Sequence, residues 1–441
     1  MLEPQTRDMK PMTRRAFLEK STLGAAALLG AGLEGCSSST PISPGNQKSV
    51  LKAEDVEYLG AFRLPRDVNG EDAGWGRGLA MRFVDGEQHF FSTTVKNNVY
   101  EVRNPGLTKD AYPMAEVSRF WGDVCGNKRV LEPSTSGEAR NGSGVYGLFF
   151  DQKDQRLYWS YGDGYNTISG RDPSLGSSSL NDANGQSQAI GAWSFKDWSC
   201  KTAMGGMLEI PAWFADQYCQ GRRLGAGFGG YFSIATVGPI SAGPALSAFN
   251  PSDCTTQNHT SSLQNTPLLG YPFNAEPYTN PDRAHRDTDY SNDFDNWNPK
   301  NGVGYWSWTD WVWQGAVWVD TPAVHGLLVL PTLGNGRTWY ETSTLHAERA
   351  SHWWYVYDPN DLAEVARGTR QTWEVQAKNT WKANFPDVNL TGWRDEPFQM
   401  IVGTCFDPTS KRVFIAVRHT WNEGNPNLTG TTVYGYQIRR T

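Results

Sequence analysis

The sequence predicts an all-β protein, a five-bladed β-propeller whose ring is closed by an N-terminal strand. The first observation is a repeat: GLFFDQKDQRLYWSYGDGYN (Gly147 to Asn166) aligns without a gap with GTCFDPTSKRVFIAVRHTWN (Gly403 to Asn422). The second is that similar short runs recur along the chain, rich in β-branched and aromatic residues and bounded by Gly, Pro, Asn and Asp. Internal repeats of this kind are typical of circular or stacked architectures.

Each repeat unit reads as four strands, the first of which begins at or near a glycine. The five glycines that mark these units are Gly78, Gly147, Gly227, Gly315 and Gly403. The third unit is the least regular, and we expect its first two strands around Gly227. We expect the second unit to end in GMLEIP (206–211) and the fourth in TWEVQA (372–377).

The third observation concerns the last unit, which reaches only its third strand, TVYGYQI, before residue 441. VEYLGAFRLP, from Val56 to Pro65, resembles the fourth strands of the other units. A strand added from the N-terminal side completes the last blade and removes the exposed edges of the ring. Two alternatives remain: six or seven blades if two have been merged, and a β-sandwich with coincidental repeats.

The N-terminal residues resemble a twin-arginine export signal. TRRAFLEK (13–20) holds the arginine pair, and STLGAAALLGAGL after it is too short and too rich in Gly and Ala to span a bilayer. LEGC, ending at Cys36, resembles a lipoprotein cleavage box. We therefore predict a signal peptide over 1–35, a Ser- and Pro-rich tether over 36–50 and one propeller over 51–441. An amphipathic N-terminal helix is the alternative.

This signal implies Tat export to the periplasm or cell surface, with membrane contact only through a lipid on Cys36. The net charge of −6 makes a nucleic-acid partner unexpected, because binding to phosphates requires a basic face. The chain holds 6 cysteines, so five remain besides Cys36 and at least one of these is unpaired. We expect a monomer.

Propeller geometry sorts the loops into two faces. The first strand of each blade starts, and the second ends, on one face beside the central channel, which we call the mouth. The long insertions fall in loops of that face, including 164–188, 274–314, 334–351 and 379–399. Long loops on one face of a rigid scaffold are usually functional. Asp163 and His419 occupy equivalent repeat positions at this mouth.

The mouth residues predicted by this geometry are aromatic, acidic and cationic. Such a mixture suits sugars, because ring faces cover apolar C–H patches while polar groups hold hydroxyls. The predicted substrate-binding residues are Trp75, Arg77, Tyr165, Trp339, Glu341, Arg418 and Trp421. We therefore predict a carbohydrate, or another polar small molecule, as the substrate.

Two reactions fit these residues. A glycoside hydrolase needs two carboxyl groups across the scissile bond, for which Asp163 and Glu396 are the best-placed pair. A polysaccharide lyase needs a base beside a uronate, for which Tyr161 or His419 would serve, and cations that neutralise the carboxylate. We predict an exported glycan-degrading enzyme of one of these kinds; the alternative is a non-catalytic surface glycan-binding or scaffold propeller.

No cofactor is predicted, and Ca²⁺ has only a weak candidate site in an acidic segment, at Asp287, Asp289 and Asp293. The chain resembles bacterial β-propeller carbohydrate-active proteins in architecture and aromatic richness, with 19 Trp and 18 Tyr. That resemblance implies the same fold and class of ligand, and it assigns no residue.

Overall fold

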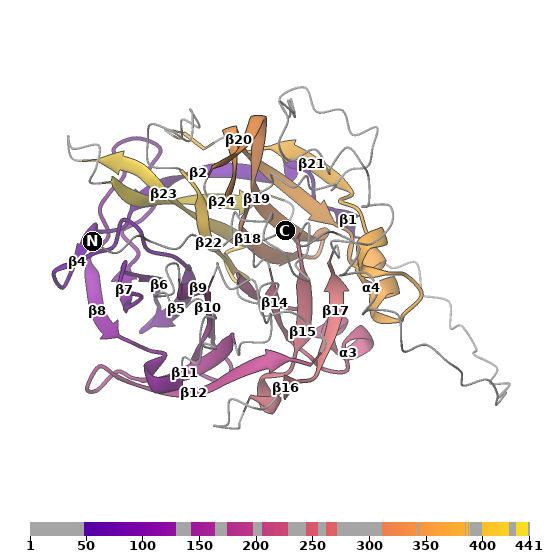
Figure 1. Ribbon diagram of the computed structural model, residues 1–441, viewed down its shortest axis with the longest axis horizontal. Coiled ribbons are helices and arrows are strands. Elements are labelled where there is room, and N and C mark those ends of the chain that lie inside the picture. Colours follow the sequence, from indigo (N-terminus) through magenta and orange to yellow (C-terminus); the bar gives the residue numbers. More distant parts are fainter. Residues whose placement is uncertain are drawn as a thin grey trace, which may run out of the picture. The chain divides into compact units, whose positions relative to one another are not determined.

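Five β-sheets form the blades of a β-propeller, as the repeat predicts (Figure 1). The computed structural model describes residues 48–128, 143–163, 174–196, 205–227, 244–254, 262–270, 311–341, 344–383, 385–386, 388, 399–422 and 429–439. Residues 46–441 form one unit, which is the part described here.

Blade 1 consists of β5 (Ala80–Val84), β6 (Glu87–Thr93), β7 (Val99–Arg103) and β8 (Val117–Gly122). Blade 2 consists of β9 (Ser143–Asp151), β10 (Arg156–Asp163), β11 (Leu175–Asn181) and β12 (Gln186–Phe195), with β16 (Ser262–Leu263) added at its outer edge. Blade 3 consists of β13 (Met207–Glu209), β14 (Leu224–Gly227), β15 (Leu246–Phe249) and β17 (Asn265–Leu269).

Blade 4 consists of β18 (Trp311–Asp320), β19 (Val324–Glu341), β20 (Thr344–Tyr357) and β21 (Asn379–Lys382), and the short β1 (Ser49–Val50) pairs with β19 in parallel. Blade 5 consists of β22 (Ile401–Asp407), β23 (Arg412–Asn422), β24 (Thr429–Ile438) and β2 (Val56–Arg63). Two helices, α3 (Ala212–Tyr218) and α4 (Pro359–Ala366), lie in connections, and β3 (Asp67–Val68) with β4 (Glu71–Asp72) forms a small ribbon.

The ring closes through the N-terminal strand, which confirms that prediction. β2 runs antiparallel to β24, with Val56 opposite Ile438 and Arg63 opposite Thr432. The innermost strands β5, β9, β13, β18 and β22 contact one another in succession around the channel. The last blade is therefore built from both ends of the folded unit, which leaves no open edge at that seam.

The repeated sequence letters have local physical causes. In the strand register, Asp151 lies opposite Arg156 and Asp407 lies opposite Arg412, across the same tight turn of blades 2 and 5. Each aspartate accepts a backbone N–H two residues later, from Lys153 at 3.0 Å and from Thr409 at 2.8 Å. These side-chain hydrogen bonds are the usual way in which Asp fixes a turn.

The repeated glycines mark places where neighbouring inner strands touch. A Cβ atom on Gly147 would lie 2.0 Å from the carbonyl oxygen of Gly205, and one on Gly403 would lie 2.3 Å from the backbone nitrogen of Leu79. A side chain at either position would push two blades apart. Glycine is therefore required at these positions by the contact between neighbouring blades and not by the conformation of its own strand.

The structure corrects the strand order in the second and third units. The segment GMLEIP contains β13, the inner strand of blade 3, and Gly227 ends the second strand of that blade, β14. The third strand of blade 2 is β11, which we expected to be part of a loop, and residues 189–195 belong to its fourth strand, β12. Helix α3 explains the error, because it lengthens the connection between β13 and β14 and disrupts the repeat spacing.

The fourth strand of blade 4 also differs from the prediction. Residues 372–374 of TWEVQA form a 3₁₀ turn, and the outer strand is β21, a few residues later. The predicted loop 334–351 is instead a long hairpin in which β19 and β20 extend beyond the blade. Helix α4 lies between β20 and β21, so this connection holds eight helical residues.

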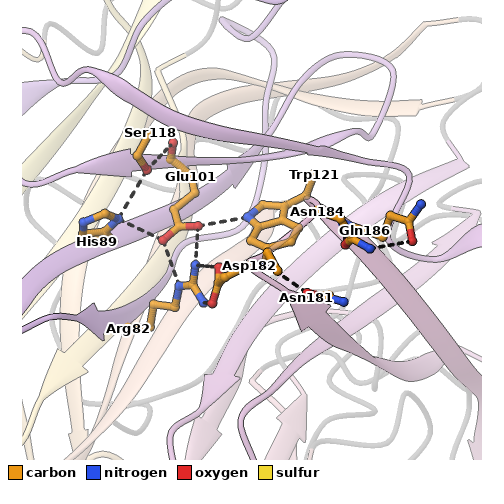
Figure 2. A network of polar contacts seen from close by, with 10 residues as sticks. Arg82, His89, Glu101, Ser118, Trp121, Asn181, Asp182, Asn184 and Gln186 are labelled. Atoms are coloured by element: carbon orange, nitrogen blue, oxygen red, sulfur yellow. Dashed lines mark hydrogen bonds and ion pairs between the residues drawn. The ribbon is translucent and has the colours of Figure 1, made fainter.

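A buried charge network joins blades 1 and 2 (Figure 2). The Arg82 guanidinium makes two hydrogen bonds of 2.8 Å to the Glu101 carboxylate and contacts Asp182, in the β11–β12 turn of blade 2, at 2.7 Å. His89 and the Trp121 indole N–H bond to the same Glu101 carboxylate, at 2.9 and 3.0 Å. Glu101 is only 1 % exposed, so this set of partners is what makes its burial tolerable.

Candidate functional site

The described part of the mouth is organised around one loop, Gly74–Gly76, between β4 and β5. A Cβ atom on Gly74 would lie 2.0 Å from the carbonyl oxygen of Thr429, and one on Gly76 would lie 1.9 Å from that of Thr93. The loop is therefore packed flush between blade 5 and blade 1, at the seam of the ring. Only glycine allows this approach on both sides of Trp75.

Hydrogen bonds fix the loop in this seam. The Arg77 backbone N–H donates to the Thr93 hydroxyl at 2.9 Å, and that hydroxyl donates to the Arg77 carbonyl at 3.1 Å. The Gly78 N–H donates to the carbonyl of Val402, in β22, at 2.8 Å. The backbone that carries Trp75 is thus tied to both blades.

Among the tryptophans whose side chains the structure describes, Trp75 is the most exposed, at 45 %. The Arg418 guanidinium lies 5.2 Å from the centre of its ring, and the His419 ring meets it edge-on with centroids 4.3 Å apart. Both neighbours come from β23 and are buried, at 6 % and 5 % exposed. The indole is therefore a fixed platform with one open surface and not a mobile side chain.

His419 is a neutral, buried imidazole. Its Nδ1 shares a hydrogen bond with the Thr429 hydroxyl, whereas its Nε2 is buried with no hydrogen-bond partner among the described residues. Burial, reinforced by the Arg418 charge, lowers the pKa of His419 to about 2. The residue also has a positive φ of 60°, where β23 and β24 lose register between Val417 and Trp421.

A second cation–aromatic pair lies next to the first along the chain. The Arg77 guanidinium lies 4.6 Å from the centre of the Tyr146 ring, which is 8 % exposed. Arg77 follows the Gly74–Gly76 loop, and Tyr146 lies in the inner strand of blade 2. The two pairs together line the mouth from blade 5 to blade 2 with tryptophan, tyrosine and arginine.

Two of the predicted site residues are packed inside the blades. Tyr161 is 7 % exposed and belongs to a core cluster with Val99 and Trp121. Trp421 is also 7 % exposed, donates its indole N–H to the Thr431 carbonyl at 3.2 Å and is covered by Arg63. Neither ring offers an open face like that of Trp75.

The other predicted residues are placed only in part. Asp163 ends β10, with its backbone opposite Ser143. Trp339 and Glu341 lie in β19, within the long hairpin, and the structure describes only their backbone. Glu396, Tyr165, Cys36, Asp287, Asp289 and Asp293 lie outside the described residues.

One carboxylate at the mouth was missed by the sequence reasoning. Glu71 accepts from the Thr94 hydroxyl at 2.7 Å and from the Asn98 amide at 2.9 Å, and Lys96 lies 3.4 Å away. Burial alone would raise the pKa of Glu71, but these donors outweigh it and hold the pKa below its ordinary value. Glu71 is thus an ionised anchor of the β3–β4 ribbon.

The described part of the chain holds neither a candidate metal site nor a membrane-spanning helix. No group of three His, Cys, Asp or Glu side chains is placed there to hold a metal ion. None of the helices described is long and apolar enough to cross a membrane. No disulfide bond joins any two of the described cysteines, which are Cys125, Cys219, Cys254 and Cys405.

Comparisons with known proteins give structural neighbours only. No family model matches the chain, and no curated protein matches it. A GH43_1 enzyme from Xanthomonas citri aligns with a TM-score of 0.41 and 10 % identity over 85 % of this chain and 89 % of that one. A GH43 β-xylosidase/α-arabinofuranosidase from a compost metagenome aligns with a TM-score of 0.41 and 10 % identity, over 86 % and 94 %.

Proposed function

We propose that this chain is an exported, lipid-anchored enzyme that binds a glycan across the propeller mouth and hydrolyses it. The observation that carries the proposal is Trp75, an indole held rigidly at the seam of the ring with its face open. Such a surface covers the apolar C–H face of a sugar ring, and adjacent arginines and amides bind the hydroxyl groups. Arg418 packs on this indole, and Arg77, two residues after Trp75 in the chain, packs on Tyr146.

The geometry favours hydrolysis over elimination. A lyase needs a base that can reach the substrate and whose pKa lies near the working pH. Tyr161 is enclosed in the core, and His419 has a pKa of about 2, which makes it a weak base. Both base candidates are therefore poorly suited, and the carboxylate pair Asp163 and Glu396 remains for acid–base work on a glycosidic bond.

In this proposal Asp163 and Glu396 act as the two carboxyl groups, one as general acid and the other as base or nucleophile. Asp163 ends the second strand of blade 2, on the mouth side, and Glu396 precedes β22, the first strand of blade 5, in the sequence. Trp75 and Arg418 bind the sugar. His419 forms one hydrogen bond to the sugar through Nε2, as donor or acceptor, and stays neutral.

The test uses the domain that begins after Cys36 and a panel of neutral and uronate-containing polysaccharides. Reducing ends and unsaturated-uronate absorbance are followed together. Reducing ends without unsaturation, lost in Asp163→Asn and in Glu396→Gln, are the expected result. Asp110→Asn, an exposed carboxylate in the β7–β8 connection, is the matched control and should retain full activity.

The second candidate is a non-catalytic glycan-binding propeller, which the same Trp75 platform also supports. Binding without new reducing ends and without unsaturated products would establish the binding propeller and refute the hydrolase. Unsaturated products would instead establish the lyase. They would contradict the argument that the burial of Tyr161 and the low pKa of His419 make both residues poor bases. The absence of both binding and cleavage across the panel would refute the proposal that the ligand is a carbohydrate.

A further inference from the structure

A cavity of about 500 Å³ lies in the central channel, on the side of the first-to-second-strand turns and away from the mouth. All five inner strands contribute to its wall, together with the start of α3. Its apolar lining residues include Met81, Phe149, Met207, Leu208, Trp318 and Phe406. None of them belongs to the mouth site.

Small residues on the inner strands leave this space open. Ala80 in β5 and Ala316 in β18 stand among the larger residues of the wall, and Ala212 begins α3 beside them. Pockets of this size, with mostly apolar walls and a few polar groups, are the usual form of small-molecule sites. The volume and the lining of the cavity are therefore those of a binding site for an apolar molecule.

Two of the three acidic residues in the lining are neutralised by the protein itself, and burial raises the pKa of the third, Glu209. Asp151 forms an ion pair of 2.5 Å with Arg223. Asp320 forms an ion pair of 2.5 Å with Lys48 and accepts the Trp213 indole N–H at 3.0 Å. Because Asp151 and Asp320 are already paired, they offer little to a cationic ligand.

The bond between Trp213 and Asp320 also fixes the position of α3. Trp213 lines the cavity and is 38 % exposed, and the next residue, Phe214, packs on Trp318 with ring centroids 4.7 Å apart. The helix is thus tied to β18 by one hydrogen bond and one aromatic contact. It stands at the cavity as a fixed wall with one exposed indole.

One polar group in the wall remains without a partner. Trp318 is 3 % exposed, lines the cavity, and its indole N–H has no hydrogen-bond partner among the described residues. A buried donor without a partner costs free energy that an acceptor on a ligand would recover. The wall is therefore suited to an uncharged ligand, and an acceptor atom on that ligand would add a hydrogen bond without being required.

We propose that this turn-side cavity is a second binding site, for an uncharged apolar molecule the size of a medium-length acyl chain or a biaryl. The site is separate from the mouth and does not depend on the proposed hydrolysis. Its ligand is held by the aromatic and methionine wall.

The first test titrates the purified full-length protein with N-phenyl-1-naphthylamine, a neutral probe whose fluorescence rises in apolar sites. Saturable binding with about one site per chain is expected. Ala212→Trp fills the cavity from the exposed start of α3 and should weaken binding at least tenfold. Gln217→Trp places the same side chain on an exposed position of the same helix, away from the cavity, and should leave binding unchanged. Equal binding by both variants would overturn the proposal.

A second readout uses Cys405, which lines the cavity and is the least buried of the described cysteines. Alkylation with N-ethylmaleimide at mildly alkaline pH, read by mass spectrometry of the Cys405 peptide, should slow at least fivefold when the probe saturates. Mild alkalinity is needed because burial and Asp407 raise the pKa of this thiol. An unchanged alkylation rate at saturation would place the probe elsewhere and contradict the proposal.

Displacement distinguishes the two sources of an apolar ligand. Loss of probe fluorescence with 1-decanol alone identifies a chain-like ligand such as a lipid tail, and loss with biphenyl alone identifies a flat aromatic one. Either result supports the site. Displacement by neither compound, in a protein that still binds the probe, shows that the cavity does not accept this class of molecule.

Discussion

The Trp75 indole meets the His419 imidazole edge-on, with ring centroids 4.3 Å apart, although the two residues come from opposite ends of the chain. The contact exists because the N-terminal strand completes the last blade and brings the loop after it against β23. Ring closure therefore does two things at once. It seals the propeller, and it assembles the open aromatic platform of the mouth.

Replacement of Gly76 tests whether the seam holds the platform. In Gly76→Ala the added Cβ would overlap the Thr93 carbonyl, so the loop must shift. We expect a loss of about 1–3 kcal/mol in the free energy of unfolding and at least a tenfold weaker glycan affinity, measured by urea denaturation and calorimetry.

Gly70→Asn is the matched control, because nothing lies within 4 Å of a Cβ added at Gly70, which has a positive φ of 76°. Asn adopts this conformation readily. Native stability and affinity in Gly76→Ala would show that the loop is not confined by the two blades.

The depressed pKa of His419 makes stability depend on pH in a definite direction. The unfolded imidazole titrates near its ordinary pKa of about 6.5, whereas the folded one titrates at about 2. Only the unfolded state takes up this proton between the two values, so the stabilisation is complete above about pH 6.5 and is lost progressively as pH falls toward 2.

The measurement is the urea midpoint at pH 7 and pH 5 in wild type and in His419→Gln. The variant should lose less stability on acidification than wild type does. His352 remains in both proteins and has a similarly lowered pKa of about 3, through burial, so its contribution cancels in the comparison. An identical pH dependence in the two proteins would mean that His419 titrates normally in the fold.

Loss of Glu101 from the buried charge network should lower the stability of the fold strongly, although this residue lies far from the mouth. Glu101→Ala leaves the buried Arg82 without its buried partner, and breaking a buried pair in this way costs about 3–5 kcal/mol. Urea denaturation should therefore show a strong loss of stability in this variant. Glu87→Ala removes the exposed partner of Arg103 and should cost less than about 1 kcal/mol. Similar losses in the two variants would show that the interior network contributes no more than a surface pair.

Much of the ring was predictable because its signals are local. The turns that begin at Asp151 and Asp407 repeat, each with an arginine opposite the aspartate. The close contacts at Gly147 and Gly403 leave no room for any other residue. Blade 3 was not predictable, because α3 interrupts the spacing. The strand LGSSSLN of blade 2 carries no aromatic pattern.

That serine-rich strand, β11, is stabilised by contacts that only the fold provides. Ser178 accepts the Trp159 indole N–H at 3.0 Å and donates to the Val124 carbonyl at 2.6 Å, so a small polar residue fills a buried position. The mouth depends on the fold in the same way. Arg418, His419 and Trp75 were predictable as mouth residues, but the roles of Thr429 and Gly74 depend on contacts that span the ring.

The most direct test of the central claim compares wild type with Trp75→Ala for binding and cleavage of the same polysaccharide panel. Trp213→Ala, which removes the exposed indole of the opposite face, is the control. The account predicts that Trp75→Ala binds and cleaves at least tenfold less well while Trp213→Ala matches wild type. Full binding and cleavage by Trp75→Ala would contradict a glycan site at the mouth.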